Sequence, residues 1–114
     1  MKYNILSNKE IAEKARLLIL EDLSVYDTVE ELADKIGTSI YKLRNAFKKQ
    51  YGVSLPVFSR IQRIEEAKRL LSKTNYTLQT IAGMVGFEEG NNFQTCFKTV
   101  VGCTPGEWRR RAQG

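Results

Sequence analysis

Apolar residues recur at steps of three and four along most of the chain, which is the spacing of an α-helix with one buried face. The longest run of this kind covers residues 54–74. Its apolar stripe consists of Phe58, Ile61, Ile64, Ala67 and Leu71. Its cations fall mostly off the stripe and are Arg60, Arg63, Lys68 and Arg69. Ser54 suits the N-cap and Pro56 the first turn, so the helix is expected to begin there. At about 1.5 Å per residue, this stretch predicts a central helix roughly 30 Å long.

Shorter runs with the same period flank this central helix, and several open with a capping signature. Ser7 with Glu10 and Thr28 with Glu31 have the spacing of a capping box, in which each residue hydrogen-bonds the backbone of the other. The first pair predicts a helix over residues 7–23. A third box, Thr104 to Glu107 with Pro105 between, predicts a short basic helix near the C-terminus.

A pair of short helices joined at a glycine, the outline of a helix-turn-helix, occurs twice. At a shift of 49 residues Ala33 aligns with Ala82 and Gly37 with Gly86. At a shift of 50, after one inserted residue, Leu43 aligns with Phe93, Phe47 with Phe97 and Gly52 with Gly102. Phe93, Phe97 and Val100 are expected to face inward in the second copy.

Two copies separated by a long helix predict an all-α chain rather than a solenoid. We treat residues 1–114 as one domain with a first helix-turn-helix unit over 8–53. A linker helix over 54–74 and a second unit over 77–111 complete it.

Composition excludes several classes of protein. The chain has 114 residues, of which 42% are hydrophobic, enough for one compact domain or two very small ones. With no histidine and two cysteines it lacks the commonest general base, a zinc ligand set and a disulfide framework. We therefore expect no enzyme activity, no catalytic residue, no metal and no cofactor. The absence of a long apolar run or a signal-peptide pattern predicts a cytoplasmic, nucleoid-associated protein without a membrane segment.

Charge is unevenly distributed along the chain. The net charge of +5 divides into −3 over residues 1–37 and +8 over residues 38–114. A basic C-terminal two-thirds favours a polyanionic partner, most often nucleic acid, although charge alone leaves a merely basic soluble protein equally open.

The second helix of a helix-turn-helix presents its N-terminal part to the base edges in the major groove. In the first copy the face opposite Leu43 and Phe47 carries the base-reading candidates Tyr41, Arg44 and Asn45. Arginine suits guanine and asparagine suits adenine. The corresponding candidates in the second copy are Gly90, Asn91, Gln94 and Thr95. The phosphate-contact candidates are Ser39, Lys42, Lys48, Lys49, Lys98 and Arg109.

For each of these residues the alternative is an ordinary exposed side chain on a solvated helix. The second face has fewer cations than the first, so we expect it to contribute less affinity and looser base selection.

These residues are similar to a known family, and the similarity covers roughly residues 8–111. Its most specific pieces are Arg63-Ile64 to Leu70-Leu71 in the central helix and Ile81-Ala82 to Gly86-Phe87 in the second unit. The third piece, Phe93 through Thr104-Pro105 to Trp108-Arg109, completes the pattern. The chain resembles the DNA-binding domain of AraC/XylS-type bacterial transcription regulators.

The resemblance implies seven helices, promoter binding and activation through contacts with RNA polymerase. It also implies the base-reading positions given above. Thr95 and Asn92 depart from the family, which usually has arginine and an aromatic residue there. The family usually carries an N-terminal ligand-sensing or dimerisation domain. The chain is therefore expected to be a short member or a fragment, with a small-molecule effector only if such a domain exists.

Two other functions stay open at this point. A helical protein–protein interaction module predicts no binding to any duplex. A non-specific nucleic-acid binder predicts a steep salt dependence with little sequence preference.

Overall fold

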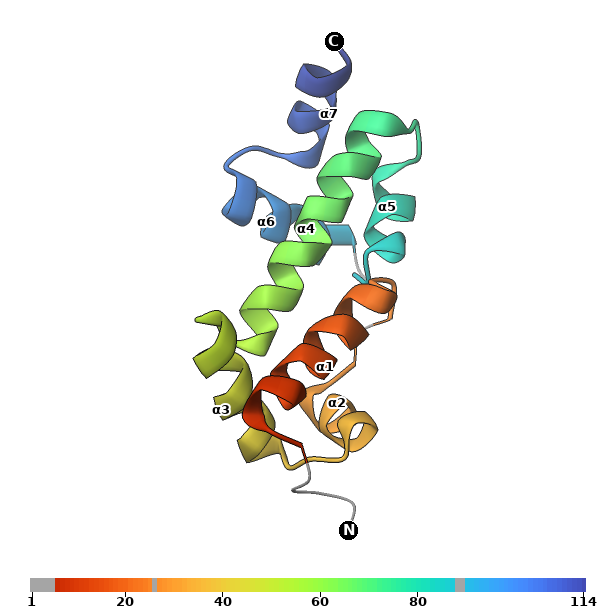
Figure 1. Ribbon diagram of the computed structural model, residues 1–114. Coiled ribbons are helices and arrows are strands. Elements are labelled where there is room, and N and C mark those ends of the chain that lie inside the picture. The colour runs from red at the N-terminus through yellow and green to blue at the C-terminus, as the bar shows by residue number, and fades with distance from the viewer. Residues whose placement is uncertain (1–5, 26, 88–89) are drawn as a thin grey trace. The chain divides into compact units, whose positions relative to one another are not determined.

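The computed structural model describes residues 6–25, 27–87 and 90–114, and within these ranges all regular structure is helical (Figure 1). The side chains of Gly90 and Asn91 lie outside the described part. The helices are α1 (Asn8–Glu21), α2 (Val29–Ile36), α3 (Ile40–Tyr51), α4 (Leu55–Lys73), α5 (Leu78–Met84), α6 (Gly90–Val101) and α7 (Pro105–Gln113). The all-α class and the number of helices are confirmed for this part of the chain. None of these helices combines the length and the apolar character needed to cross a membrane.

The chain divides into two compact units, which we describe separately. Unit 1 comprises Met1–Asp22 and Tyr26–Ser59, and unit 2 comprises Leu23–Val25 and Arg60–Gly114. The division falls within α4, so the first turns of this helix belong to unit 1 and the remainder to unit 2. The assignment of residues 54–74 as a linker between two functional units, 8–53 and 77–111, stays a prediction.

The predicted capping signatures form in the structure. Ser7 Oγ accepts from the backbone N–H of Glu10, and the Glu10 carboxylate accepts from the N–H of Ser7, at 3.1 and 3.2 Å. Thr28 with Glu31 and Thr104 with Glu107 make the same pair of bonds. Each box satisfies N–H groups that a helix start leaves without an intrahelical partner, so these helices begin where the sequence predicts.

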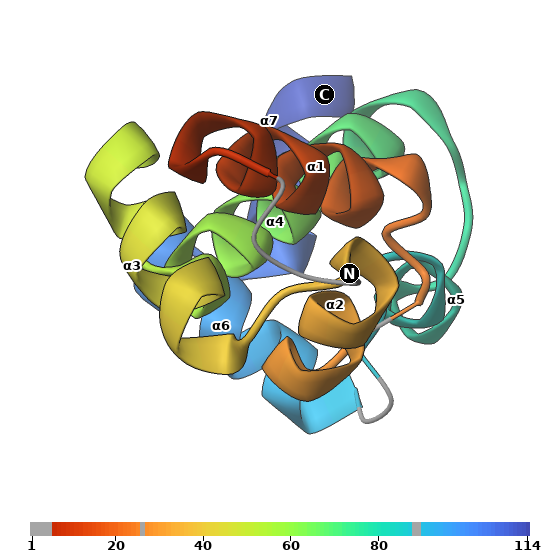
Figure 2. The same cartoon turned by 60° about the horizontal axis from the view of Figure 1, so that its bottom comes forward.

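Unit 1 is built on α1, which lies beside α2 and, more extensively, beside α3 (Figure 2). Leu43, Ala46 and Phe47 of α3 are buried, as predicted. The Phe47 ring contacts those of Tyr51 and Phe58, with centroids 4.8 and 5.3 Å away. The inner face of α3 is therefore held by a packed core.

Unit 2 has its own core, to which α4, α5 and α6 contribute. Its buried members are Ile64, Ala67, Leu70, Leu71, Ile81, Ala82, Val85, Phe93 and Phe97. Trp108 of α7 packs edge-on against Phe97 at 6.4 Å between ring centroids, as expected for a core-filling residue. Its Nε1 donates to the Lys68 carbonyl and to Ser72 Oγ, both at 3.3 Å.

Three residues do not lie where the apolar pattern places them. Ile61 is 38% exposed and Val100 is 42% exposed, whereas Arg63 is only 4% exposed. The buried face of α4 in unit 2 runs through Arg63, Ile64, Ala67, Leu70 and Leu71, which turns it away from Ile61. In the last turn of α6, Val101 rather than Val100 packs against the core.

Candidate nucleic-acid interface

The turn between α2 and α3 sets the position of the first candidate reading helix. Gly37 has a φ of 84°, a left-handed conformation that glycine adopts without a steric penalty, and its N–H donates to the Ala33 carbonyl. Ser39 then caps α3, with its Oγ accepting from the Lys42 N–H at 3.1 Å. The chain thus passes from α2 into α3 through a tight turn at a glycine, as in a helix-turn-helix.

Burial of one side of α3 leaves the predicted reading side in solvent. Tyr41 is 77% exposed, and Arg44 and Asn45 are exposed as well. The Tyr41 ring therefore does not pack into the core of the free protein. Tyr41, Arg44 and Asn45 therefore share one accessible surface, as the sequence predicts, although their role as base readers is not tested by exposure.

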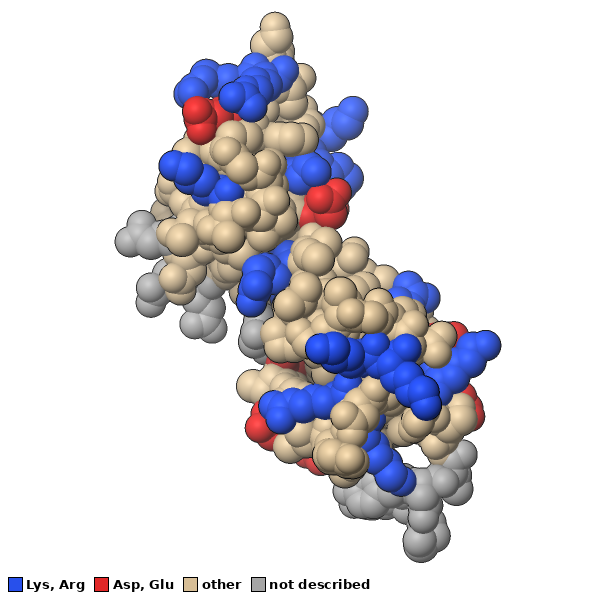
Figure 3. Space-filling model, turned by 90° about the vertical axis from the view of Figure 1, so that its left-hand side faces the viewer, with Lys and Arg blue, Asp and Glu red and all other residues tan. Residues whose placement is uncertain are grey.

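The charged residues of α3 are all cations. The phosphate candidates Lys42, Lys48 and Lys49 are exposed, and α3 contains no Asp or Glu. Figure 3 views the molecule from the side where α3 lies in Figure 1, and Lys and Arg side chains crowd this face of unit 1, with acidic residues toward its edges. An exposed cationic surface of this kind favours binding of a polyanion, and salt weakens that binding.

The candidate reading helix of unit 2 is α6, and it is less charged. Gln94, Thr95 and Lys98 are exposed, while Phe93 and Phe97 on its other side are buried. Gly90 and Asn91 fall outside the residues whose side chains the structure describes, so their predicted roles stay predictions. Lys98 is the one Lys or Arg of α6, and the lower affinity expected of this face stays a prediction.

Two of the phosphate candidates are already hydrogen-bonded. Ser39 Oγ accepts the capping bond, which leaves its hydroxyl hydrogen available to donate. Arg109 Nε donates to the Leu71 carbonyl and its Nη2 to the Thr74 carbonyl, both at 3.2 Å. These bonds hold the Arg109 guanidinium at the C-terminal end of α4, and its phosphate contact stays a prediction.

Other chemistry has little support in the part of the chain that the structure describes. No group of three or more Cys, Asp or Glu side chains could hold a metal ion there. Cys103 is buried, and Cys96 is half-buried, so that burial raises the pKa of the Cys96 thiol. A raised pKa lowers the fraction of the thiolate, which disfavours Cys96 as a nucleophile.

Comparison with known proteins agrees with this geometry. The family model described as a helix-turn-helix domain matches residues 32–111. The transcriptional activator RhaR of Klebsiella pneumoniae is 31% identical over 103 residues, which cover 90% of this chain and 37% of that protein. The chain spans well under half the length of the curated relatives that it matches.

Solved structures give the same answer. The C-terminal domain of AraT, a response regulator from Geobacillus stearothermophilus, is 30% identical with a TM-score of 0.88, over 95% of this chain and 88% of that one. The DNA-binding domain of AdpA, solved in complex with a target DNA, is 27% identical with a TM-score of 0.81, over 91% of this chain and 97% of that one. With a family match across most of its length, the chain belongs to the AraC family of helix-turn-helix transcription regulators.

Proposed function

We propose that the chain binds double-stranded promoter DNA sequence-specifically, with α3 and α6 reading adjacent major grooves. The observation that carries the proposal is the outer face of α3. It presents Tyr41, Arg44 and Asn45 to solvent on a helix whose other side is locked into a core. A pre-positioned helix with an arginine and an asparagine one residue apart is suited to the base edges of guanine and adenine.

The cations of α3 divide into two roles. Arg44 lies with Asn45 on the reading face, and we assign it to a base edge. Lys49 lies in the last turn, and we assign it, with Ser39, Lys42, Lys48, Lys98 and Arg109, to phosphate oxygens. In unit 2 we assign base reading to Gly90, Asn91, Gln94 and Thr95, with less affinity than in unit 1.

Selection of duplexes from a random library at fixed salt tests the proposal and identifies the site. Enrichment of one site is expected. A module that binds only proteins would shift no duplex, and a non-specific binder would enrich none while keeping a steep salt dependence.

Arg44→Ala and Lys49→Ala form a matched pair, since each removes one positive charge from α3. We expect Arg44→Ala to cost about 1–3 kcal/mol at the selected site and to relax selectivity at one base pair. Lys49→Ala should weaken all sequences alike and lower the salt slope by about one. Titrations of both variants against the selected duplex and its single-base mismatches measure this. Uniform loss in Arg44→Ala would place Arg44 on phosphate instead.

The ranking of the two units has its own comparison. The double variant Asn91→Ala/Gln94→Ala should bind the selected site more tightly than Arg44→Ala does, because α6 is expected to contribute less affinity than α3. Weaker or equal binding by the double variant would reverse the ranking.

The wider role follows from family membership. We propose that the protein activates transcription through contacts with RNA polymerase and acts in the cytoplasm at the nucleoid. We propose that the domain works by binding and not by catalysis, and that an effector acts only through a further N-terminal domain.

A further inference from the structure

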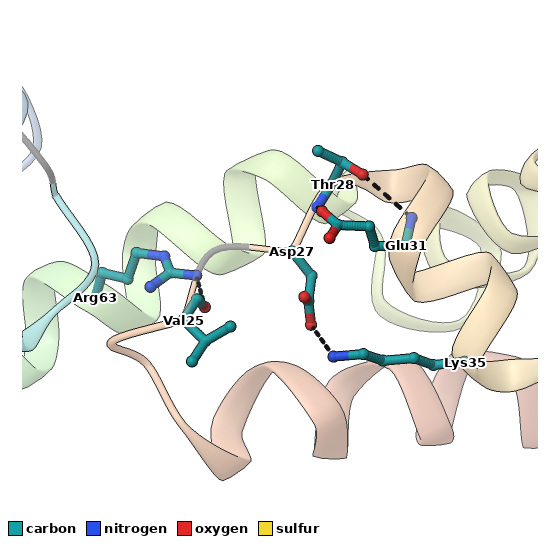
Figure 4. Close-up of polar contacts among 6 residues, drawn as sticks. All are labelled: Val25, Asp27, Thr28, Glu31, Lys35 and Arg63. Atoms are coloured by element: carbon teal, nitrogen blue, oxygen red, sulfur yellow. Dashed lines mark hydrogen bonds and ion pairs between the residues drawn. The ribbon is translucent and has the colours of Figure 1, made fainter.

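Arg63 is a buried cation of unit 2, and its guanidinium donates hydrogen bonds to backbone carbonyls. Its Nη1 donates to the carbonyl oxygens of Leu23 and Val85, the latter at 3.1 Å, and its Nη2 donates to the Val25 carbonyl at 3.1 Å. Figure 4 shows the side chain reaching from α4 to Val25. One planar group thus holds backbone atoms from sequence regions 38 to 40 residues before it and 22 residues after it.

The Val85 end of this arrangement is the turn of the second helix-turn-helix. Val85 is the C-cap of α5, and Gly86 follows with a φ of +85°. A methyl group at Gly86 would overlap Nη1 of Arg63 and lie 2.5 Å from the Leu23 carbonyl oxygen. Glycine is therefore needed here for its conformation and also for the room that the guanidinium occupies.

Lysine could not reproduce these contacts. The donors of arginine are spread across a rigid plane, whereas lysine carries a compact ammonium on a flexible stem. A buried charge is costly unless hydrogen bonds compensate it, so the contacts to Leu23, Val25 and Val85 have to be present together. A side chain that needs all of these hydrogen bonds fixes the three carbonyl groups relative to one another.

We propose that Arg63 is a positioning residue for DNA reading by unit 2. By holding the Val85–Gly86 turn, it sets where α6 begins and so where Gln94 and Thr95 meet the bases. The N-terminal part of a recognition helix lies nearest the base edges, and hydrogen bonds weaken steeply when their geometry is disturbed. This inference rests on the proposed function, because it concerns the half of the site that α6 reads.

The test compares Arg63→Lys with Arg69→Met. Arg69 lies on α4 too, but it is exposed and ion-paired with Glu66 at 2.7 Å, so its replacement controls for loss of a cation from this helix. Each protein is titrated with the selected duplex and with two derivatives in which either half of the site is scrambled. Arg63→Lys should retain discrimination of the half read by α3 and lose about tenfold in discrimination of the half read by α6, the equivalent of about one base contact. Arg69→Met should leave unchanged the affinity ratio of the selected duplex to each of the two scrambled duplexes.

Amide hydrogen exchange separates the failure of this inference from that of the proposed function. In Arg63→Lys, exchange should rise at the Val85–Gly86 turn and at the start of α6 but not in α3. If wild-type protein selects no duplex, the proposed function fails, and the exchange pattern alone decides whether Arg63 holds the turn.

A second variant covers the case in which Arg63→Lys does not fold. Gly86→Ala pushes on the guanidinium from the opposite side, and Gly102→Ala has a comparable φ of +97° with nothing near the added methyl group. Gly86→Ala should lose discrimination of the α6 half, and Gly102→Ala should lose less. Unchanged discrimination and exchange in Arg63→Lys, or equal losses in the two glycine variants, would overturn the proposal.

Discussion

The side chain of Thr38 provides a direct test of how unit 1 is packed. Thr38 lies in the turn between α2 and α3 and is only 6% exposed. Its N–H donates to the Ala33 carbonyl at 3.0 Å, so its backbone is satisfied. Its Oγ1 is buried and has no hydrogen-bond partner among the residues that the structure describes. Burial therefore removes the hydroxyl from bulk water, and none of the described residues replaces that contact.

The expected gain from removing this hydroxyl follows from its environment. Burying a hydroxyl without a partner costs about 1–3 kcal/mol in protein mutational data. Valine has the same branched shape and fills the same space with a methyl group. We therefore expect Thr38→Val to raise the free energy of unfolding by about 1–2 kcal/mol, which raises Tm by about 4–8 °C per kcal/mol in a domain of this size.

The duplication supports an apolar residue at this position. Phe87 occupies the corresponding place after Gly86 in unit 2, where its ring packs 5.6 Å from that of Phe93. The second copy thus places a hydrocarbon side chain in the turn where the first has a hydroxyl.

Urea and thermal unfolding of three variants measure the effect. Thr38→Val removes the hydroxyl, Thr38→Ser removes only the methyl group, and Thr38→Ala removes both. The free energy of unfolding should be higher for Thr38→Val than for wild type and lower for Thr38→Ser than for wild type. The serine variant should lie below wild type by about 0.8 kcal/mol because it loses a buried methyl group. A Thr38→Val protein less stable than wild type, with an unchanged m-value, would show that the hydroxyl is satisfied in solution and would refute the reasoning.

Three further measurements test other parts of the structure. Gly86→Ala and Gly102→Ala share a left-handed strain of about 1–2 kcal/mol, but only Gly86→Ala also disturbs the Arg63 bonds, so it should be less stable by about a further 1.5–3 kcal/mol in urea unfolding. The pKa of Glu107 is lowered, first by its bond from the Thr104 backbone N–H and then by the Thr104 side chain. Its stabilisation is present above the ordinary glutamate pKa and lost as pH falls through the lowered value, so wild type should lose more Tm than Glu107→Gln between pH 6 and 3. Thr28→Ala removes the N-cap acceptor of α2 and should cost about 1 kcal/mol in unfolding free energy, whereas replacement by glycine should cost only a few tenths.

Local rules predict most of this fold. Each capping box is decided by residues three positions apart, and Gly37 and Gly86 mark turns because few other residues tolerate their φ. The buried faces of α3 and α6 follow from the helical period, which places Leu43 with Phe47 and Phe93 with Phe97. None of these features needs knowledge of distant residues, and for that reason they are readable in the sequence.

The misplacement of Arg63 and Ile61 has a non-local cause. A single stripe along the whole central helix assumes one partner surface, but the two ends of α4 belong to different units. Each end of α4 buries the face that packs against the core of its own unit. The carbonyls of Leu23, Val25 and Val85 accept hydrogen bonds from buried Arg63, and these residues lie far away in the sequence. The exposure of Tyr41, Arg44 and Asn45 was predictable because the inner face of their own helix dictates it.

The duplication also separates residues that build the fold from residues that we assign to DNA recognition. Where the copies agree in character, as at Leu43 and Phe93 or at Gly52 and Gly102, the residues are buried or hold a left-handed turn. At Arg44 and Gln94 the copies differ in chemistry, and both side chains are exposed.

Packing requires similar residues at corresponding positions of the two copies, because each copy must bury the inner face of its own helix pair. Base edges make no such demand, because the two helices would meet different sequences. The difference between Arg44 and Gln94 is therefore expected of a protein that reads an asymmetric site. A selected site whose two halves were identical would remove the reason for that difference.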